Sequence, residues 1–163
     1  MQEKKIIISI AFISAIILFG GAVIASKYSP GADVVSDEKV DVLVEKTSYD
    51  WGEIDINNGT VSQTFPIKNN GSSSLTLQNI ATSCMCTTAK LTYNGQTSPD
   101  FGMHEKSNYS LSVLPGESAD LTVTFDPAFH GPSGVGPITR QVIVETNDPD
   151  NQQLEFSLTA QVL

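Results

Sequence analysis

The chain has 163 residues, a formal net charge of −9 and only 17% charged side chains. From Tyr28 onward it carries 17 acidic and 6 basic residues, and this negative excess excludes nucleic acids and anionic lipid surfaces as electrostatic partners. The chain contains two cysteines, which are too few for a small scaffold held together by disulfides, so the domain needs a hydrophobic core.

The N-terminal region predicts a membrane anchor. Residues 1–5 include Lys4 and Lys5, and residues 6–26 then run without a charged side chain. A helix of that length crosses the ~30 Å hydrocarbon core, and it exceeds the usual 7–15-residue apolar core of a signal peptide. We expect residues 6–26 to be an uncleaved transmembrane signal anchor, with residues 1–5 in the cytoplasm by the positive-inside rule. The protein is then a single-pass cell-membrane protein with its C-terminal domain outside the cytoplasm, or a secreted one if the signal is cleaved.

The rest of the chain reads as a linker followed by an all-β domain. Residues 27–40 mix turn formers and acidic residues without a sustained period, as a linker does. Residues 41–163 show no helical stripe, but short runs rich in Val, Ile, Thr, Leu and Phe recur between turn signals. The predicted strands are 42–47, 60–68, 74–81, 109–113, 120–125, 139–146 and 154–162. About seven strands at this spacing predict an immunoglobulin-like antiparallel β-sandwich.

Three parts of the domain do not fit the predicted strands. We expect Trp51 to lie in an early Trp-Gly turn as a plug of the core. Residues 92–108 and 127–137 are irregular and rich in Gly and Pro, and they contain Met103, His104 and His130. Long loops on a rigid sandwich often carry function, so these two segments are candidates for a binding site.

Several short motifs occur together in this domain. They are Trp51-Gly52-Glu53-Ile54, Phe65 ahead of Asn69-Asn70-Gly71, Leu75 and Leu77, Ser83-Cys84-Met85-Cys86-Thr87, Pro115-Gly116-Glu117, Phe125-Asp126 and Thr146-Asn147-Asp148. With them, residues 42–162 resemble the bacterial Cys-x-Cys family of exported immunoglobulin-like domains, termed domain of unknown function 1573 and akin to Hydin-type domains. The resemblance implies the fold and hardly any activity. The chain departs from the short form of that pattern through the added stretch with Met103 and His104 and the later loop with His130.

The two cysteines form the most informative motif. On a strand, residues i and i+2 point to one face, so Cys84 and Cys86 would present their sulfurs side by side while Met85 points into the core. An extended i, i+2 pair lies near the upper limit of the 4.4–6.8 Å that disulfide α-carbons span. A Cys84–Cys86 bridge therefore needs a kink in the backbone, and we expect such a bridge to be strained and easily reduced rather than structural.

The ligand types favour a soft metal ion. Thiolates suit Cu(I) and Zn(II), imidazole suits both, and a thioether adds preference for copper. The candidate metal ligands are Cys84, Cys86, His104, His130 and Met103. Two cysteines and two histidines would complete a zinc site, but Cys-x-Cys is tighter than the usual Cys-x₂₋₄-Cys spacing of zinc sites, so we prefer Cu(I).

Three functions stay open from the sequence. The first is binding of Cu(I) for metal carriage or sequestration, with no enzymatic activity, since no general base, nucleophile elbow or carboxylate pair stands out. The second is a structural or interaction module that docks an envelope protein and binds no metal. The third is a thiol–disulfide redox protein, although the Cys-x-x-Cys and βαβ context of thioredoxin-like enzymes is missing.

Overall fold

The computed structural model describes residues 35–103 and 107–163. The predicted anchor at residues 6–26, most of the linker and His104 lie outside these ranges. Within them, no helix is both long and apolar enough to cross a membrane.

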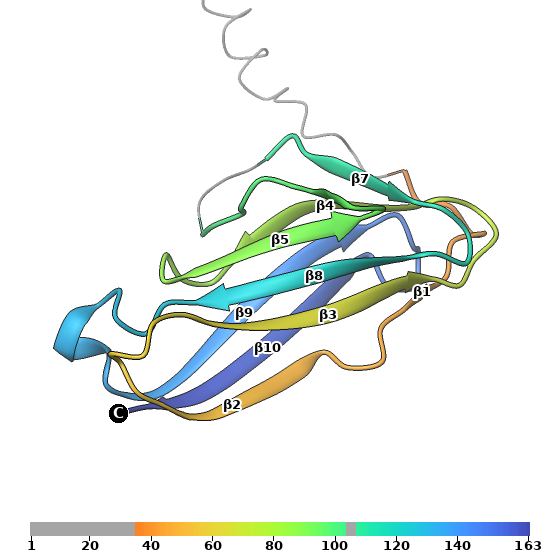
Figure 1. The fold of residues 1–163 in the computed structure, drawn as a ribbon. Coiled ribbons are helices and arrows are strands. Elements are labelled where there is room, and N and C mark those ends of the chain that lie inside the picture. The colour runs from red at the N-terminus through yellow and green to blue at the C-terminus, as the bar shows by residue number, and fades with distance from the viewer. Residues whose placement is uncertain (1–34, 104–106) are drawn as a thin grey trace, which may run out of the picture. The chain divides into compact units, whose positions relative to one another are not determined.

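The described chain forms ten β-strands and one short 3₁₀-helix (Figure 1). In chain order they are β1 (Val42–Leu43), β2 (Ser48–Ile54), β3 (Val61–Asn69), β4 (Leu75–Thr82), β5 (Thr87–Tyr93), β6 (Gln96–Thr97), β7 (Ser110–Val113), β8 (Ser118–Phe125), the 3₁₀-helix η1 (Gly131–Gly134), β9 (Gly136–Thr146) and β10 (Gln153–Val162). The first sheet has the order β1-β3-β8-β5-β6 and the second has β2-β10-β9-β4-β7. The predicted all-β sandwich is thus confirmed.

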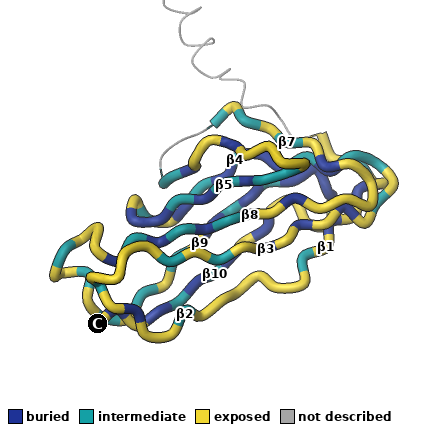
Figure 2. Tube along the Cα trace, viewed as in Figure 1, coloured by how far each residue is buried: buried dark blue, intermediate teal, exposed yellow. Residues whose placement is uncertain are grey.

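The core lies between the two sheets, because the long strands alternate buried and more accessible residues (Figure 2). On β8 the buried positions are Ala119, Leu121, Val123 and Phe125, and on β10 they are Leu154, Phe156, Leu158, Ala160 and Val162. Alternate side chains of a strand point to opposite faces, so each strand gives one face to the core. Phe65 of β3 and Phe156 of β10 join the two sheets with ring centroids 5.0 Å apart.

Several details differ from the expected strands. The described residues form ten strands rather than about seven, and β2 pairs with β10 in parallel, so the sandwich is not fully antiparallel. The predicted strand 42–47 ends after two residues, because the chain leaves the first sheet there and enters the second as β2. Trp51 lies in β2 rather than in a turn, although its ring does pack against the core.

Strand β5 was not expected and matters most for the site. Its buried positions are Thr87, Ala89 and Leu91, and two of these residues are small or polar, which hides the alternation in the sequence. β5 pairs with β8 in the first sheet, whereas β4 pairs with β9 in the second. Residues 83–86 therefore form the entire connection between β4 and β5, which belong to different sheets. Both cysteines lie in this connection.

Candidate functional site

The Cys84-Met85-Cys86 segment is a tight turn rather than a strand, which corrects the expected placement. The amide of Thr87 donates to the Cys84 carbonyl oxygen over 3.1 Å, and the Thr82 hydroxyl lies 3.0 Å from that same oxygen. The amide of Ser83 donates to the carbonyl oxygen of Gln141 on β9. These contacts bend the chain where it passes from one sheet to the other.

The bend brings the two sulfurs together. Cys84 and Cys86 form a disulfide, and their α-carbons are 5.2 Å apart, well inside the range that such bonds need. The amide of Cys86 also donates to the Cys84 sulfur over 3.3 Å. The sheet-to-sheet turn therefore supplies the backbone kink that a Cys84–Cys86 disulfide requires.

The turn also changes the place of Met85. We expected this side chain in the core, but it is 57% exposed. The reason is that a turn does not alternate its side chains between a core face and a solvent face as a strand does. The two cysteines differ as well, because Cys84 is half-buried and Cys86 is only 3% exposed.

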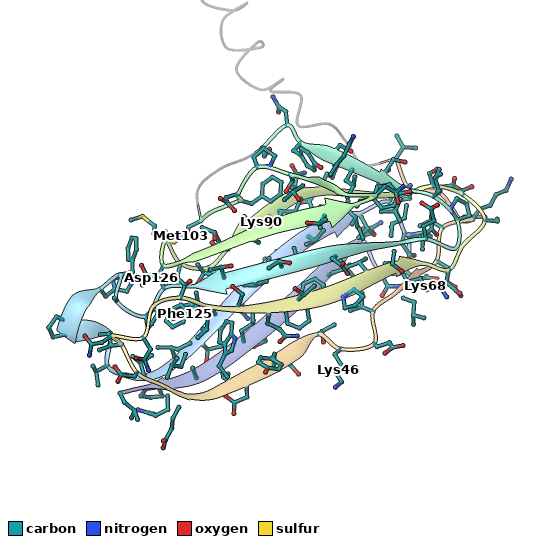
Figure 3. All side chains as sticks on the ribbon, viewed as in Figure 1. Lys46, Lys68, Lys90, Met103, Phe125 and Asp126 are labelled. Atoms are coloured by element: carbon teal, nitrogen blue, oxygen red, sulfur yellow. A yellow bond between two sulfur atoms is a disulfide. The ribbon has the colours of Figure 1, made fainter. Side chains whose placement is uncertain are left out.

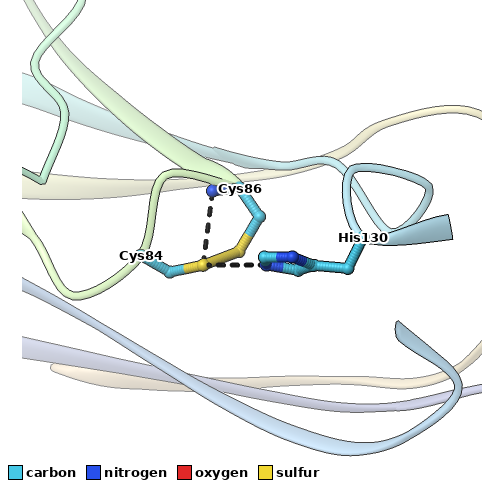
Figure 4. A group of neighbouring side chains, drawn as sticks. All are labelled: Cys84, Cys86 and His130. Carbon is cyan, nitrogen blue, oxygen red and sulfur yellow. Dashed lines mark hydrogen bonds between the residues drawn. A yellow bond between two sulfur atoms is a disulfide. The ribbon is translucent and has the colours of Figure 1, made fainter. Parts of the chain in front are cut away.

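His130 is the predicted ligand that the fold brings to the cysteines (Figure 4). Its Nε2 atom lies 3.5 Å from the Cys84 sulfur, and the ligand atoms of Cys84, Cys86 and His130 all lie within 4.8 Å of one another. His130 is exposed and precedes the 3₁₀-helix, and the ring of Phe129 packs edge-on against it at 5.1 Å. The described site thus brings one imidazole nitrogen next to two sulfurs that are joined as a disulfide.

Gly102, the residue before Met103, contacts the end of the strand that leads into the cysteine turn. The amide of Thr82, two residues before Cys84, donates to the carbonyl oxygen of Gly102 over 3.3 Å. Figure 3 shows Met103 at the same end of the sandwich as Phe125, the last residue of β8. Met103 is half-buried, and its role as a ligand stays a prediction, as does that of His104.

Arg140 of β9 is a site residue that the sequence did not suggest. Its Nε atom donates to the Cys86 sulfur over 3.1 Å, and its guanidinium carbon lies 5.3 Å from the centre of the Phe125 ring. A further donation from Nη1 to the Thr139 carbonyl oxygen holds the group in place. Burial lowers the pKa of Arg140, yet a guanidinium keeps its charge at neutral pH. No local motif marks this contact, because 54 residues separate Arg140 from Cys86.

The comparisons agree with this architecture. Residues 42–101 match the model of the family described as "Protein of unknown function (DUF1573)", a stretch that includes both cysteines but neither His130 nor Arg140. No curated protein matches the chain. The structure itself defines a β-sandwich domain with a Cys84–Cys86 pair at one sheet-to-sheet turn, and the family match covers part of this domain.

Solved structures resemble the sandwich at low sequence identity. A protein of unknown function from Porphyromonas gingivalis W83 is 19% identical with a TM-score of 0.56, over 82% of this chain and 51% of that one. The ASH/PapD-like domain 7 of human CEP192 is 14% identical with a TM-score of 0.49, over 80% of this chain and 91% of that domain. The chain thus spans about half the length of the Porphyromonas protein, and the likeness concerns the fold alone.

Proposed function

We propose that the domain, once its disulfide is reduced, binds Cu(I) through Cys84, Cys86 and His130 for carriage or sequestration. The observation that supports this function is the convergence of two sulfurs and one imidazole nitrogen within 4.8 Å. Ligand bonds of zinc-type sites are about 2.0–2.3 Å long, so donors this close need only small movements to share one ion. Soft thiolates with an imidazole suit Cu(I), which accepts fewer ligands than the four that structural zinc takes.

The oxidised form cannot serve as this donor set, because a disulfide sulfur is not a thiolate. The proposed site is therefore available only after reduction. The bridge encloses a single residue, and by chain-entropy estimates a three-residue loop gains roughly 1.6 kcal/mol against about 4.7 kcal/mol for a hundred-residue loop. So small a loop argues against a mainly structural bridge.

The location that we propose is outside the cytoplasm, on the membrane through residues 6–26. The uncharged run in the sequence supports it, and so does the disulfide, since such bonds persist in oxidising compartments. The net negative charge supports a metal or protein partner rather than nucleic acid.

Cu(I) titration of the chemically reduced protein against a competing chelator tests this function. We expect Cys84→Ser and Cys86→Ser each to weaken binding by at least about 100-fold, and His130→Ala by at least about 10-fold, because even the loss of an outer-shell partner of a metal site typically costs about 10–100-fold. The oxidised protein should not bind. Equal, weak binding by the wild type and both cysteine variants would overturn the proposal.

Three further arms define the ligand set and the metal. His104→Ala and Met103→Leu should weaken binding only if those predicted ligands complete the site. A parallel titration with Zn(II) compares the alternative metal, which needs a fourth ligand. The matched control is Ser133→Ala, which changes an exposed side chain of the 3₁₀-helix three residues after His130 without removing a soft ligand.

A second candidate function is thiol–disulfide exchange without metal. The Cys84–Cys86 disulfide and the Arg140 Nε atom on the Cys86 sulfur favour it. In that case the reduced protein would pass electrons to partner disulfides and show no Cu(I) affinity beyond that of the cysteine variants. The third function, an interaction module, draws support from the exposed side chains of Met85 and Phe129 beside the site.

A further inference from the structure

We propose that a protein dithiol reduces this disulfide by attacking the Cys84 sulfur and releasing Cys86 as a thiolate toward Arg140, with Met85 and Phe129 as its contact surface. The inference rests on the proposed function, because reduction is the step that would free the two thiolates for Cu(I). It names the class of partner and the sulfur that this partner reaches.

The two sulfurs are not equally open to attack. Cys86 is 3% exposed and packs in a buried cluster with Phe125, Ala160 and Val162. Cys84 only borders that cluster and is half-buried. Thiol–disulfide exchange depends on access to the attacked sulfur, so an incoming thiolate reaches Cys84 first.

Arg140 makes Cys86 the better leaving group. Its Nε–H points at the Cys86 sulfur over 3.1 Å, so negative charge that develops there during bond cleavage meets a cation and a hydrogen-bond donor. The guanidinium is already held by Phe125 and by the Thr139 carbonyl oxygen, so it need not be reorganised during the reaction. The greater exposure of Cys84 and the positive charge of Arg140 beside Cys86 thus favour the same reaction, in which Cys84 is attacked and Cys86 is the leaving group.

The surroundings of Cys84 fit a protein better than a small soluble thiol. Eight large hydrophobic side chains of the described residues are exposed, and three of them belong to the two segments that form the site: Met85, Phe129 and Val135. Met85 separates the two cysteines, and Phe129 packs on His130, which contacts Cys84. Exposed apolar groups gathered at a reactive centre indicate a protein contact, and methionine adapts its shape to a partner.

The exchange balances in two steps. A thiolate of the partner dithiol forms a bond to the Cys84 sulfur while the Cys84–Cys86 bond breaks, and the electron pair leaves on the Cys86 sulfur. The second thiolate of the partner then attacks the sulfur of the partner's first cysteine in this mixed disulfide. This attack releases Cys84 as a thiolate. Two electrons thus pass to the pair, and the partner becomes a disulfide. The partner's two thiols lose their protons to solvent when they ionise, and the freed Cys84 and Cys86 thiolates take up protons from solvent unless they stay ionised.

Reduction rates of the oxidised, copper-free protein test the proposal with two probes, dithiothreitol and reduced thioredoxin. Loss of the disulfide is followed by alkylation of the freed thiols and mass spectrometry. The double variant Met85→Ser/Phe129→Ser should react with thioredoxin at least about five times more slowly while its rate with dithiothreitol changes less than about two-fold, because only the protein needs the surface. Leu114→Ser, a control at an exposed hydrophobic residue in the β7–β8 turn, should change neither rate.

Arg140 is tested with the same two probes. Arg140→Gln should slow both reductants by about ten-fold, because it removes the charge at the leaving sulfur. Arg140→Lys should recover part of the rate, and circular dichroism confirms that each variant is folded. Rates with Arg140→Gln that equal the wild type would overturn the role of Arg140.

The attacked sulfur is identified with a thioredoxin whose second active-site cysteine is serine. This probe stops at the mixed disulfide, and fragmentation in the mass spectrometer should place it on Cys84. An adduct on Cys86, or equal slowing of both reductants by Met85→Ser/Phe129→Ser, would overturn the proposal. Chemically reduced protein is used for the Cu(I) titration, so a failure there overturns the proposed function while leaving these rates to decide the exchange reaction.

Discussion

Phe125 links the packed end of the core to the sulfur pair. Its ring is stacked on that of Trp51 with centroids 5.9 Å apart, and the Arg140 guanidinium lies over it. Arg140 in turn donates to Cys86, so the order of contacts runs from β2 through β8 to β9 and the β4–β5 turn. A change at Trp51 can therefore affect the orientation of Arg140 through Phe125.

Trp51 offers a test of what its indole contributes. The Nε1 atom is buried and has no hydrogen-bond partner among the described residues. Trp51→Phe keeps an aromatic ring on Phe125 and removes the unpaired donor, so the free energy of unfolding should change by less than about 1 kcal/mol. Trp51→Leu loses the aromatic contact and should cost about 1–3 kcal/mol. Urea unfolding followed by circular dichroism measures both, and equal losses would show that ring stacking contributes nothing.

The elements show how a local irregularity places the site. On β4, Leu75, Leu77 and Gln78 are buried ahead of Asn79, and Ile80 and Thr82 are buried after it. The apolar buried face therefore changes phase along the strand. Asn79 has a φ of 50°, and the register of β4 with β9 shifts between Gln78 and Ala81. A bulge of this kind re-aims the end of a strand, and here that end leads directly into the cysteine turn.

Replacing Asn79 tests this bulge. Asparagine and glycine tolerate positive φ, whereas alanine there costs about 1–2 kcal/mol. Both Asn79→Ala and Asn79→Gly lose the hydrogen bond to Glu145, so their difference isolates the backbone conformation. We expect Asn79→Ala to unfold at the lower urea concentration. Equal stability of the two variants would show that the positive φ is not what alanine disturbs.

At this scale the sequence predicted the long strands well. The predicted ranges 60–68, 74–81, 120–125, 139–146 and 154–162 each overlap an observed strand, since alternation and turn residues are local signals. The edge strand β2 escaped prediction because most of its residues are exposed and show no alternation. β5 escaped because small and polar residues occupy part of its buried face.

Hydrogen bonds join the start of the described domain to the loop between β9 and β10. The amide of Val42 donates to the Asp148 carboxylate over 2.8 Å across 106 residues, and the Asp37 amide donates to the Asn147 carbonyl oxygen. Asp148 also accepts from the Asp150 amide and the Asn151 side chain. The start of the first sheet is thereby tied to the β9–β10 loop of the second.

This contact predicts a pH dependence of stability. Burial raises the pKa of Asp148, but hydrogen bonds from Val42, Asp150 and Asn151 outweigh it and leave the pKa below its usual value. The stabilisation is present above the unfolded-state pKa near 3.8 and is lost as pH falls through the lower folded-state pKa. Urea unfolding between neutral pH and pH 3 should show the wild type losing more stability than Asp148→Asn. Equal losses of stability in the wild type and in Asp148→Asn would show that groups other than Asp148 cause the acid sensitivity.

The sequence by itself determined the sandwich and singled out the cysteine pair, because strand alternation, turn chemistry and residue spacing are local properties. It could not decide which of the distant residues meet that pair. His130 and Arg140 lie 46 and 54 residues from the cysteines that they contact, and only the pairing of β8 and β9 with their neighbours brings them there. The turn that joins the sulfurs is likewise tertiary, since it exists because β4 and β5 belong to opposite sheets.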